Sequence, residues 1–203
     1  MPFTDAGLLA MGFPLPGTDW RFVPIPDSDG KQMLNIALDR LTGQAMVLPT
    51  LEDQQQWLNL VRLTEHAVRS YGRARDHLAE DAAHGHDGRV SPFLLAIDEL
   101  ESCVTNAHRA VLAAKDLLEA GVLELVLPPT HLTKRLYDVR RAIEHIDGRI
   151  KRRRGRDNRA MHVLFPVEGG LVIDDSEITW EELAHALVLL RDCLRGARPS
   201  PTP

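Results

Sequence analysis

The sequence predicts an α+β protein, mainly α, in which a bundle of four main helices carries a small amount of β structure. Two observations predict this class. After residue 50, long segments repeat apolar residues at helical spacing, and the low aromatic content of 5% implies a core of Leu, Val, Ile and Ala. Before it, Pro and Gly punctuate the chain, which favours short strands and turns. We therefore expect a β-rich N-terminal extension (1–49), a helical bundle (50–196) and a disordered tail (197–203).

The N-terminal extension is expected to contain two or three strands. The candidates are residues 19–26, 33–39 and 41–49, which are joined by the turn signals DSDG and TG. The first residues, MPFTDAGLLAMGFPLPG, lack a basic segment and are broken by prolines, so they make a poor signal peptide.

Cysteine usage and hydropathy indicate a cytoplasmic protein with no membrane partner. No apolar run approaches the length that spans a bilayer. Cys103 and Cys193 both lie in apolar helical patterns, which favours buried, reduced thiols; a disulfide is the alternative that the sequence leaves open.

Two long helices are predicted first. The segment 51–81 has apolar residues at helical spacing, with Gly72 as a point where it could kink. A Gly-rich loop follows, and a second helix runs over about 92–120, where Gly121 is a natural stop. Within that second helix, Asn106 and His108 are either polar neighbours of a functional site or simply exposed.

A third helix, about 130–152, has the narrowest apolar stripe. Its members fall within about 40° of one line around the helix axis. They are Leu132, Leu136, Val139, Ile143, Ile146 and Ile150. This helix should therefore pack one narrow face on its neighbours, as helices of a bundle do.

The C-terminal part predicts a β-hairpin and a last helix. Residues 161–174 contain two apolar runs around Glu-Gly-Gly, which is typical of a hairpin. The helix that follows begins with a capping box, in which Thr179 caps the first turn and Glu182 reaches back. Trp57, Tyr137 and Trp180 are interpreted as packing anchors at helix ends.

The motifs of metal and cofactor enzymes are missing, so we predict no metal site and no cofactor. A di-metal carboxylate bundle needs two Glu-x-x-His pairs, and Glu182 with His185 is the one pair present. The His-rich stretch 84–87 lies in a predicted loop and has no partner motif. There is also no phosphate-binding glycine loop and no Gly-x-Ser-x-Gly.

Charge is unevenly distributed along the chain. The net charge is −5, yet residues 134–159 hold eleven Lys/Arg against four Asp/Glu. A local basic excess on an acidic protein predicts one surface that attracts phosphate. The alternative, held equally, is a disordered basic linker without a specific partner.

The outward side of the third helix carries the candidate chemistry. Arg141 and His145 are i,i+4 neighbours opposite the apolar stripe, with Asp138 nearby. Arg140 and Glu144 form a second i,i+4 pair on a flank. A histidine near arginines and a carboxylate is a workable general base near neutral pH. The competing interpretation, which spacing alone favours, is an ordinary solvated helix face.

The stretch RRAIEHID, within the third long helix of a bundle, resembles the HEPN family (higher eukaryotes and prokaryotes nucleotide-binding domains). The mark of that family is an arginine four to six residues before a histidine, and Arg140 and His145 fit it with four residues between them. Many active members carry a polar residue, often Asn, directly after the arginine, where this chain has Arg141. The resemblance covers about residues 51–195, chiefly through the order of the helices.

The resemblance implies a metal-independent endoribonuclease that cleaves RNA by attack of its own 2′-hydroxyl, in a cleft between two copies of the chain. His145 would be the base or acid, Arg140 with Arg141 would hold phosphate, and Glu144 and Asp147 would orient the basic groups. The residues expected to bind RNA are Arg149, Lys151, Arg152, Arg153, Arg154 and Arg156.

The same resemblance implies a role as a toxin or phage-defence effector, with a cognate neutralising protein as a partner. Two alternatives stay open. One is a non-catalytic HEPN-like interaction or assembly module, and the other is a ligand-binding regulatory domain.

Overall fold

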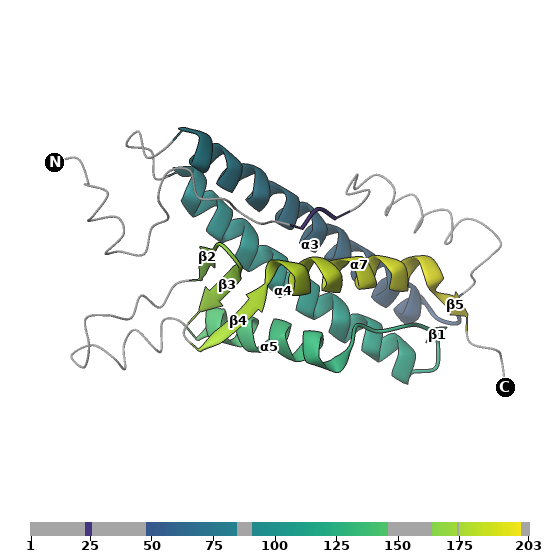
Figure 1. The fold of residues 1–203 in the computed structure, drawn as a ribbon. Helices are drawn as coiled ribbons and strands as arrows, with labels where there is room; N and C mark the ends of the chain where they lie inside the picture. The colour runs from purple at the N-terminus through teal and green to yellow at the C-terminus, as the bar shows by residue number, and fades with distance from the viewer. Residues whose placement is uncertain (1–22, 26–47, 85–90, 146–163, 174, 200–203) are drawn as a thin grey trace.

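The computed structural model describes residues 23–25, 48–84, 91–145, 164–173 and 175–199 (Figure 1). These residues form four helices and five short strands, so the prediction of a mainly helical α+β protein is confirmed. The strands expected within residues 1–49 fall almost entirely outside the described residues.

The fold is built on two long helices, α3 (Leu51–His84) and α4 (Ser91–Glu119), which lie side by side in opposite directions (Figure 1). Helix α3 continues through Gly72 to residue 84, three residues beyond the predicted end. Small residues on α4 are completely buried and allow close approach of its neighbours. They are Ala96, Cys103, Ala107, Ala110 and Ala114.

Helix α4 ends as its sequence predicts. Gly121 adopts the left-handed conformation, with φ of 67°. Its amide donates to the carbonyl of Leu118, and the amide of Val122 donates to that of Leu117. This pair of hydrogen bonds is the Schellman motif, in which glycine has no Cβ to strain the left-handed turn.

Two very short strands tie the C-terminal end of the chain to the turn after α4. Strand β1 (Leu123–Glu124) pairs antiparallel with β5 (Arg198–Pro199). Ala197 is buried as well. The prediction of a disordered tail from residue 197 is therefore wrong for residues 197–199, because backbone pairing with β1 holds them.

Helix α5 (Thr130–Glu144) packs the predicted stripe against the core. Its buried residues are Leu132, Leu136, Val139 and Ala142, and Ile143 is partly buried. The helix ends at Glu144, with His145 as its C-cap, and residues 146–152 of the predicted helix lie outside the described residues.

A three-stranded antiparallel sheet lies at one end of the bundle (Figure 1). Strands β2 (Phe165–Val167) and β3 (Gly170–Ile173) form the predicted hairpin. The sequence did not predict the third strand, β4 (Ser176–Thr179), which pairs with β3 and leads directly into the last helix.

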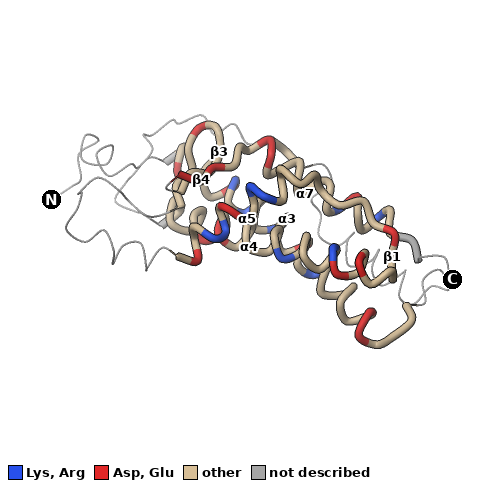
Figure 2. The backbone as a smooth tube through the Cα atoms, turned by 90° about the horizontal axis from the view of Figure 1, so that it is seen from below, with Lys and Arg blue, Asp and Glu red and all other residues tan. Residues whose placement is uncertain are grey.

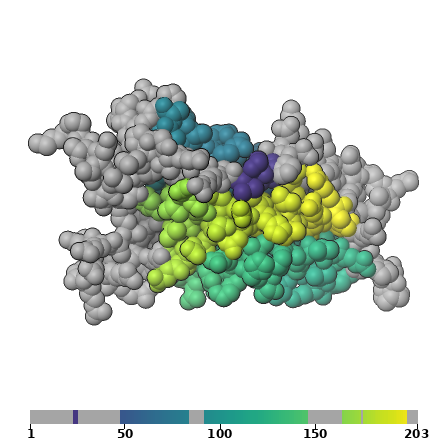
Figure 3. Space-filling model, viewed as in Figure 1, coloured from purple at the N-terminus to yellow at the C-terminus, as the bar shows by residue number. Residues whose placement is uncertain are grey.

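The last helix, α7 (Trp180–Gly196), has the predicted capping box. The Thr179 hydroxyl accepts from the amide of Glu182, and the Glu182 carboxylate accepts from the amide of Thr179. Trp180 donates its indole N–H to the carbonyls of Val167 and Glu168, which joins the helix to the hairpin turn. In the space-filling view, α7 fills the space between α3 and α5 (Figure 3).

Because β3 and β4 lie in close contact, we expect alanine to destabilise the fold at one of two neighbouring glycines and not at the other. A Cβ on Gly170 would lie 2.3 Å from the carbonyl oxygen of Ile178, whereas a Cβ on Gly169 would meet no atom within 4 Å. We expect Gly170→Ala to lower the free energy of unfolding by about 1–3 kcal/mol. Gly169→Ala, the matched control, should change it by less than about 0.5 kcal/mol. Urea denaturation measures both, and equal effects would contradict the packing described.

Candidate functional site

Helix α5 is the described helix with more cations than anions. It contains four Lys/Arg and two Asp/Glu, whereas α4 contains two Lys/Arg and five Asp/Glu. Figure 2 shows these charges along the backbone. An anionic ligand would therefore be attracted to α5 more than to the α4 surface beside it.

The guanidinium of Arg140 is held between α5 and α4. Its Nε and Nη2 donate to Oε1 of Glu144, at 2.9 and 2.5 Å. Its Nη1 lies 2.9 Å from Nδ1 of His108, which comes from α4. Because a guanidinium can only donate, Nδ1 must accept, and the ring of His108 is neutral with its proton on Nε2.

His108 is buried, with 4% of its surface exposed. Burial lowers its pKa, the positive charge of Arg140 lowers the pKa further, and the carboxylate of Glu144 opposes this. The neutral form that the hydrogen bond requires is therefore also the form that the surroundings favour. Of the two interpretations of His108, the structure supports a polar neighbour of the predicted site and excludes an exposed side chain.

Tyr137 lies against the same histidine. The two rings have their centroids 5.6 Å apart at an interplanar angle of 45°. Tyr137 is nevertheless 44% exposed, whereas Trp57 and Trp180 are completely buried. The interpretation as a packing anchor is thus confirmed for the two tryptophans and wrong for Tyr137, whose ring contacts that of His108 while much of the residue stays exposed.

The remaining predicted site residues lie apart from Arg140. Arg141 and His145 are exposed, as expected for the outward side of α5. Asp138 pairs with Lys134, at 2.5 Å, and not with His145. Among the described residues, the hydrogen bonds of Arg140 lead to His108 and Glu144, and none joins it to His145.

Several predicted site residues cannot be placed. Asp147 and the six residues expected to bind RNA, Arg149, Lys151, Arg152, Arg153, Arg154 and Arg156, all lie in 146–163, outside the described residues. In the sequence, the first of these basic residues, Arg149, comes five positions after Glu144, the last residue of α5.

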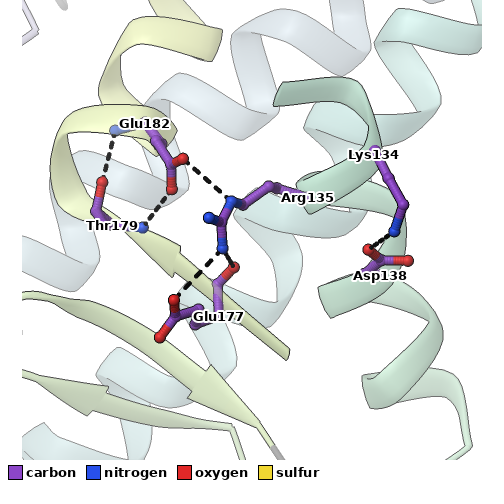
Figure 4. Close-up of polar contacts among 6 residues, drawn as sticks. All are labelled: Lys134, Arg135, Asp138, Glu177, Thr179 and Glu182. Atoms are coloured by element: carbon purple, nitrogen blue, oxygen red, sulfur yellow. Dashed lines mark hydrogen bonds and ion pairs between the residues drawn. The ribbon is translucent and has the colours of Figure 1, made fainter. Parts of the chain in front are cut away.

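The opposite flank of α5 is tied to β4 and α7 through Arg135 (Figure 4). Its Nε lies 3.1 Å from Oε1 of Glu182, and its Nη1 donates to the carbonyl of Glu177 at 3.3 Å. Glu182 thus accepts the capping-box hydrogen bond with one carboxylate oxygen and pairs with Arg135 of α5 through the other. A pocket of about 300 Å³ opens beside this junction, and it is lined by His131, Lys134, Arg135, Asp138, Asp175, Ser176 and Glu177.

Neither the pocket nor the thiols suggest metal chemistry. Within the described ranges, no group of three or more His, Cys, Asp or Glu side chains could hold a metal ion. Cys103 and Cys193 are both buried and free, which confirms buried thiols rather than a disulfide. Burial raises the pKa of both thiols, and that of Cys193 is about 11, so neither is a ready nucleophile.

No helix in the described part of the chain combines the length and the apolar character that crossing a membrane requires.

Comparisons with known proteins found no protein-family model, no curated protein and no solved structure that matches this chain.

Sequence reasoning missed two contacts. It left His108 between two interpretations, and it assigned Glu182 to the helix cap without a link to Arg135. A weak signal existed for His108, because it directly follows Ala107, one of the apolar residues at helical spacing over 92–120, and so lies at the edge of the apolar side of that helix. The link between Arg135 and Glu182 has no local signal, since the two residues are 47 positions apart.

The burial of His108 predicts a pH-dependent stability. Its pKa is lowered in the folded chain, so the unfolded chain binds a proton first as the pH falls. The contribution is complete above the ordinary histidine pKa of about 6.5 and is lost below it. Between about pH 7.5 and pH 5, we expect the urea midpoint of the wild type to fall more than that of His108→Asn.

The exposed His145 provides the control for this experiment. The variant His145→Asn makes the same exchange at a surface position and shows how much of any change comes from losing a histidine that is not buried. If the midpoints of wild type and His108→Asn fall in parallel, His108 is not held neutral by its surroundings.

Proposed function

We propose that this chain is a HEPN-like, metal-independent endoribonuclease that acts as a homodimer. One observation carries the proposal: the guanidinium of Arg140 is held by His108 and Glu144 on a helix with an excess of cations, five residues before the exposed His145. A solvated arginine with no role would be free to move, whereas this one has a fixed place at the edge of α5.

The chemistry needs only a base and a cation from the protein. The neutral imidazole of His145 would take the proton of an RNA 2′-hydroxyl. The 2′-oxygen then attacks the adjacent phosphorus, and the bond from phosphorus to the 5′-oxygen breaks. Arg140, helped by Arg141, would bind the phosphate oxygens, where negative charge increases in the transition state.

The geometry of α5 supports a dimer rather than a site within one chain. Arg140 and His145 are five residues apart, so their side chains leave the helix axis about 140° apart. One copy therefore directs them toward different sides. A two-fold axis beside α5 could bring Arg140 of one copy near His145 of the other. The second His145 would then be available to protonate the leaving 5′-oxygen.

The basic run after α5 would extend such a site. Its arginines and lysine would contact several phosphates, with binding that weakens as salt rises. The roles implied by the resemblance, a toxin or phage-defence effector with a neutralising partner, belong to this proposal.

A second candidate is a non-catalytic interaction module, and a specific observation favours it. Tyr137 and Leu112 are large apolar side chains that are 44% and 42% exposed. Tyr137 contacts His108, and Leu112 lies one turn after His108 on α4, so both belong to the joint surface of α4 and α5. Exposed apolar groups of this kind suit a protein–protein contact.

The nuclease proposal predicts specific losses of activity in EDTA. We expect wild-type protein to cleave single-stranded RNA, and His145→Ala or Arg140→Ala to lower the rate by about 100-fold or more. Cleavage of a labelled RNA on a denaturing gel measures this effect.

His131→Ala is the matched control, because His131 is also an exposed histidine of α5 but lies near its other end. It should cleave at the wild-type rate. Intact RNA with the wild type, or the same cleavage with all the variants, would defeat the nuclease proposal and leave the interaction module.

Dimerisation through the joint surface of α4 and α5 predicts a second, independent result. Leu112→Glu should weaken the dimer by at least about tenfold, because it places a charge in an apolar contact. Leu118→Glu is the control, since Leu118 is similarly exposed but about 120° away around α4. Sedimentation velocity over a concentration series distinguishes them. Equal dissociation constants for the two variants would place the interface elsewhere.

A further inference from the structure

His108 and Arg140 form the one hydrogen bond to an arginine of α5 that the described part of α4 provides. We infer that His108 is a positioning residue, whose neutral ring orients the guanidinium of Arg140 toward an incoming phosphate. The inference rests on the proposed function for the identity of the ligand, but the orientation of Arg140 can be measured without it.

The hydrogen bonds of Arg140 leave a defined part of the guanidinium available. Of its five N–H groups, Nε and one N–H of Nη2 are used by Glu144, and one N–H of Nη1 is used by His108. Two N–H groups remain, one on each Nη atom. Each of these two N–H groups can donate to a phosphate oxygen.

The buried His108 fixes the orientation of the Arg140 guanidinium more firmly than Glu144 alone could fix it. Glu144 sits on the same helix and its side chain is 47% exposed, so it can move together with Arg140. His108 belongs to another helix, is 4% exposed, and its ring contacts that of Tyr137. A buried ring has few orientations, so its Nδ1 is a fixed point for Nη1 of Arg140.

Protonation would reverse the contact. A proton on Nδ1 removes the acceptor and places a cation beside the guanidinium. The charged groups that act on the His108 ring are Arg140, which opposes protonation, and Glu144, which favours it. The positioned state of Arg140 therefore belongs to neutral and higher pH.

The alternative is that the hydrogen bond with Arg140 only satisfies the buried ring nitrogen of His108 and does not position the arginine. Two substitutions separate these roles. Asn places an amide oxygen close to the position of Nδ1 and cannot titrate, whereas Leu fills the space without an acceptor. Because both keep most of the volume, thermal unfolding should confirm that both variants are folded before any comparison.

The first measurement follows Arg140 itself by NMR. The Nη1–H resonance of Arg140, assigned by its loss in Arg140→Lys, reports the contact with position 108 and should be slow to exchange with water in the wild type and in His108→Asn. In His108→Leu it should exchange at least about tenfold faster, as an arginine freed from an ordered contact does. Equal exchange in wild type and His108→Leu would overturn the positioning role, whatever the activity.

The second measurement uses RNA cleavage in EDTA across a pH series. We expect His108→Leu to lower the rate by about tenfold, and His108→Asn to stay within about threefold of the wild type. On the acid side, the rate of His108→Asn should fall less steeply than that of the wild type, because one titrating group is gone. Matching acid limbs, or equal losses with Asn and Leu, would also overturn the role.

The two measurements fail in different ways. If the wild type does not cleave RNA while the resonance of Arg140 responds as expected, the nuclease proposal fails and the positioning of Arg140 stands. If cleavage depends on Arg140 and His145 but not on the acceptor at position 108, the nuclease proposal stands and His108 is a structural residue.

Discussion

The burial of α4 on several sides is the constraint on which the rest of the structure depends. This helix contacts α3, α5 and α7, and its alanines let the three neighbours approach closely. A helix in this position should be apolar over most of its surface. His108 is the buried polar side chain of α4 and needs a partner, since an unsatisfied ring nitrogen would cost about 1–3 kcal/mol. Arg140 of α5 provides that partner.

The same pairing fits the way α5 is rotated about its own axis. Its apolar stripe turns toward the core, Arg140 then faces α4, and Arg135 faces β4 and α7 on the other side. With both flanks engaged, the side opposite the core is left at the surface, and it carries Arg141 and His145. The exposure of these two residues is thus a consequence of the packing of α5 and would exist with or without a catalytic role.

The sequence was sufficient where residues close together in the chain determine the local structure. The stripe of α5, the glycine after α4 and the capping box at Thr179 each depend on residues within a few turns of one another. It failed where the structure of a segment depends on residues far away in the sequence. Strand β4 is four residues long and is stabilised by pairing with β3, so its own sequence predicts little.

The candidate site shows the same limit. Helical geometry correctly gave the Arg140–Glu144 pair, because both residues lie on one helix. It also correctly gave the exposed side of α5. It could not decide which helix would stand beside Arg140, since that depends on the packing of α4 and α5. That His108 is the partner of Arg140 therefore follows only from the fold.

The two partners of Arg140 differ in how readily each could be exchanged for a ligand. The pair with Glu144 is partly solvated, and such pairs contribute about 0–1 kcal/mol. The hydrogen bond to His108 is largely buried, and removing its donor would leave Nδ1 unsatisfied at a cost of about 1–3 kcal/mol. Of the two contacts, the hydrogen bond to His108 is therefore the harder to give up. In the proposed nuclease, a phosphate would bind the two N–H groups that neither partner uses, while His108 keeps the guanidinium in place.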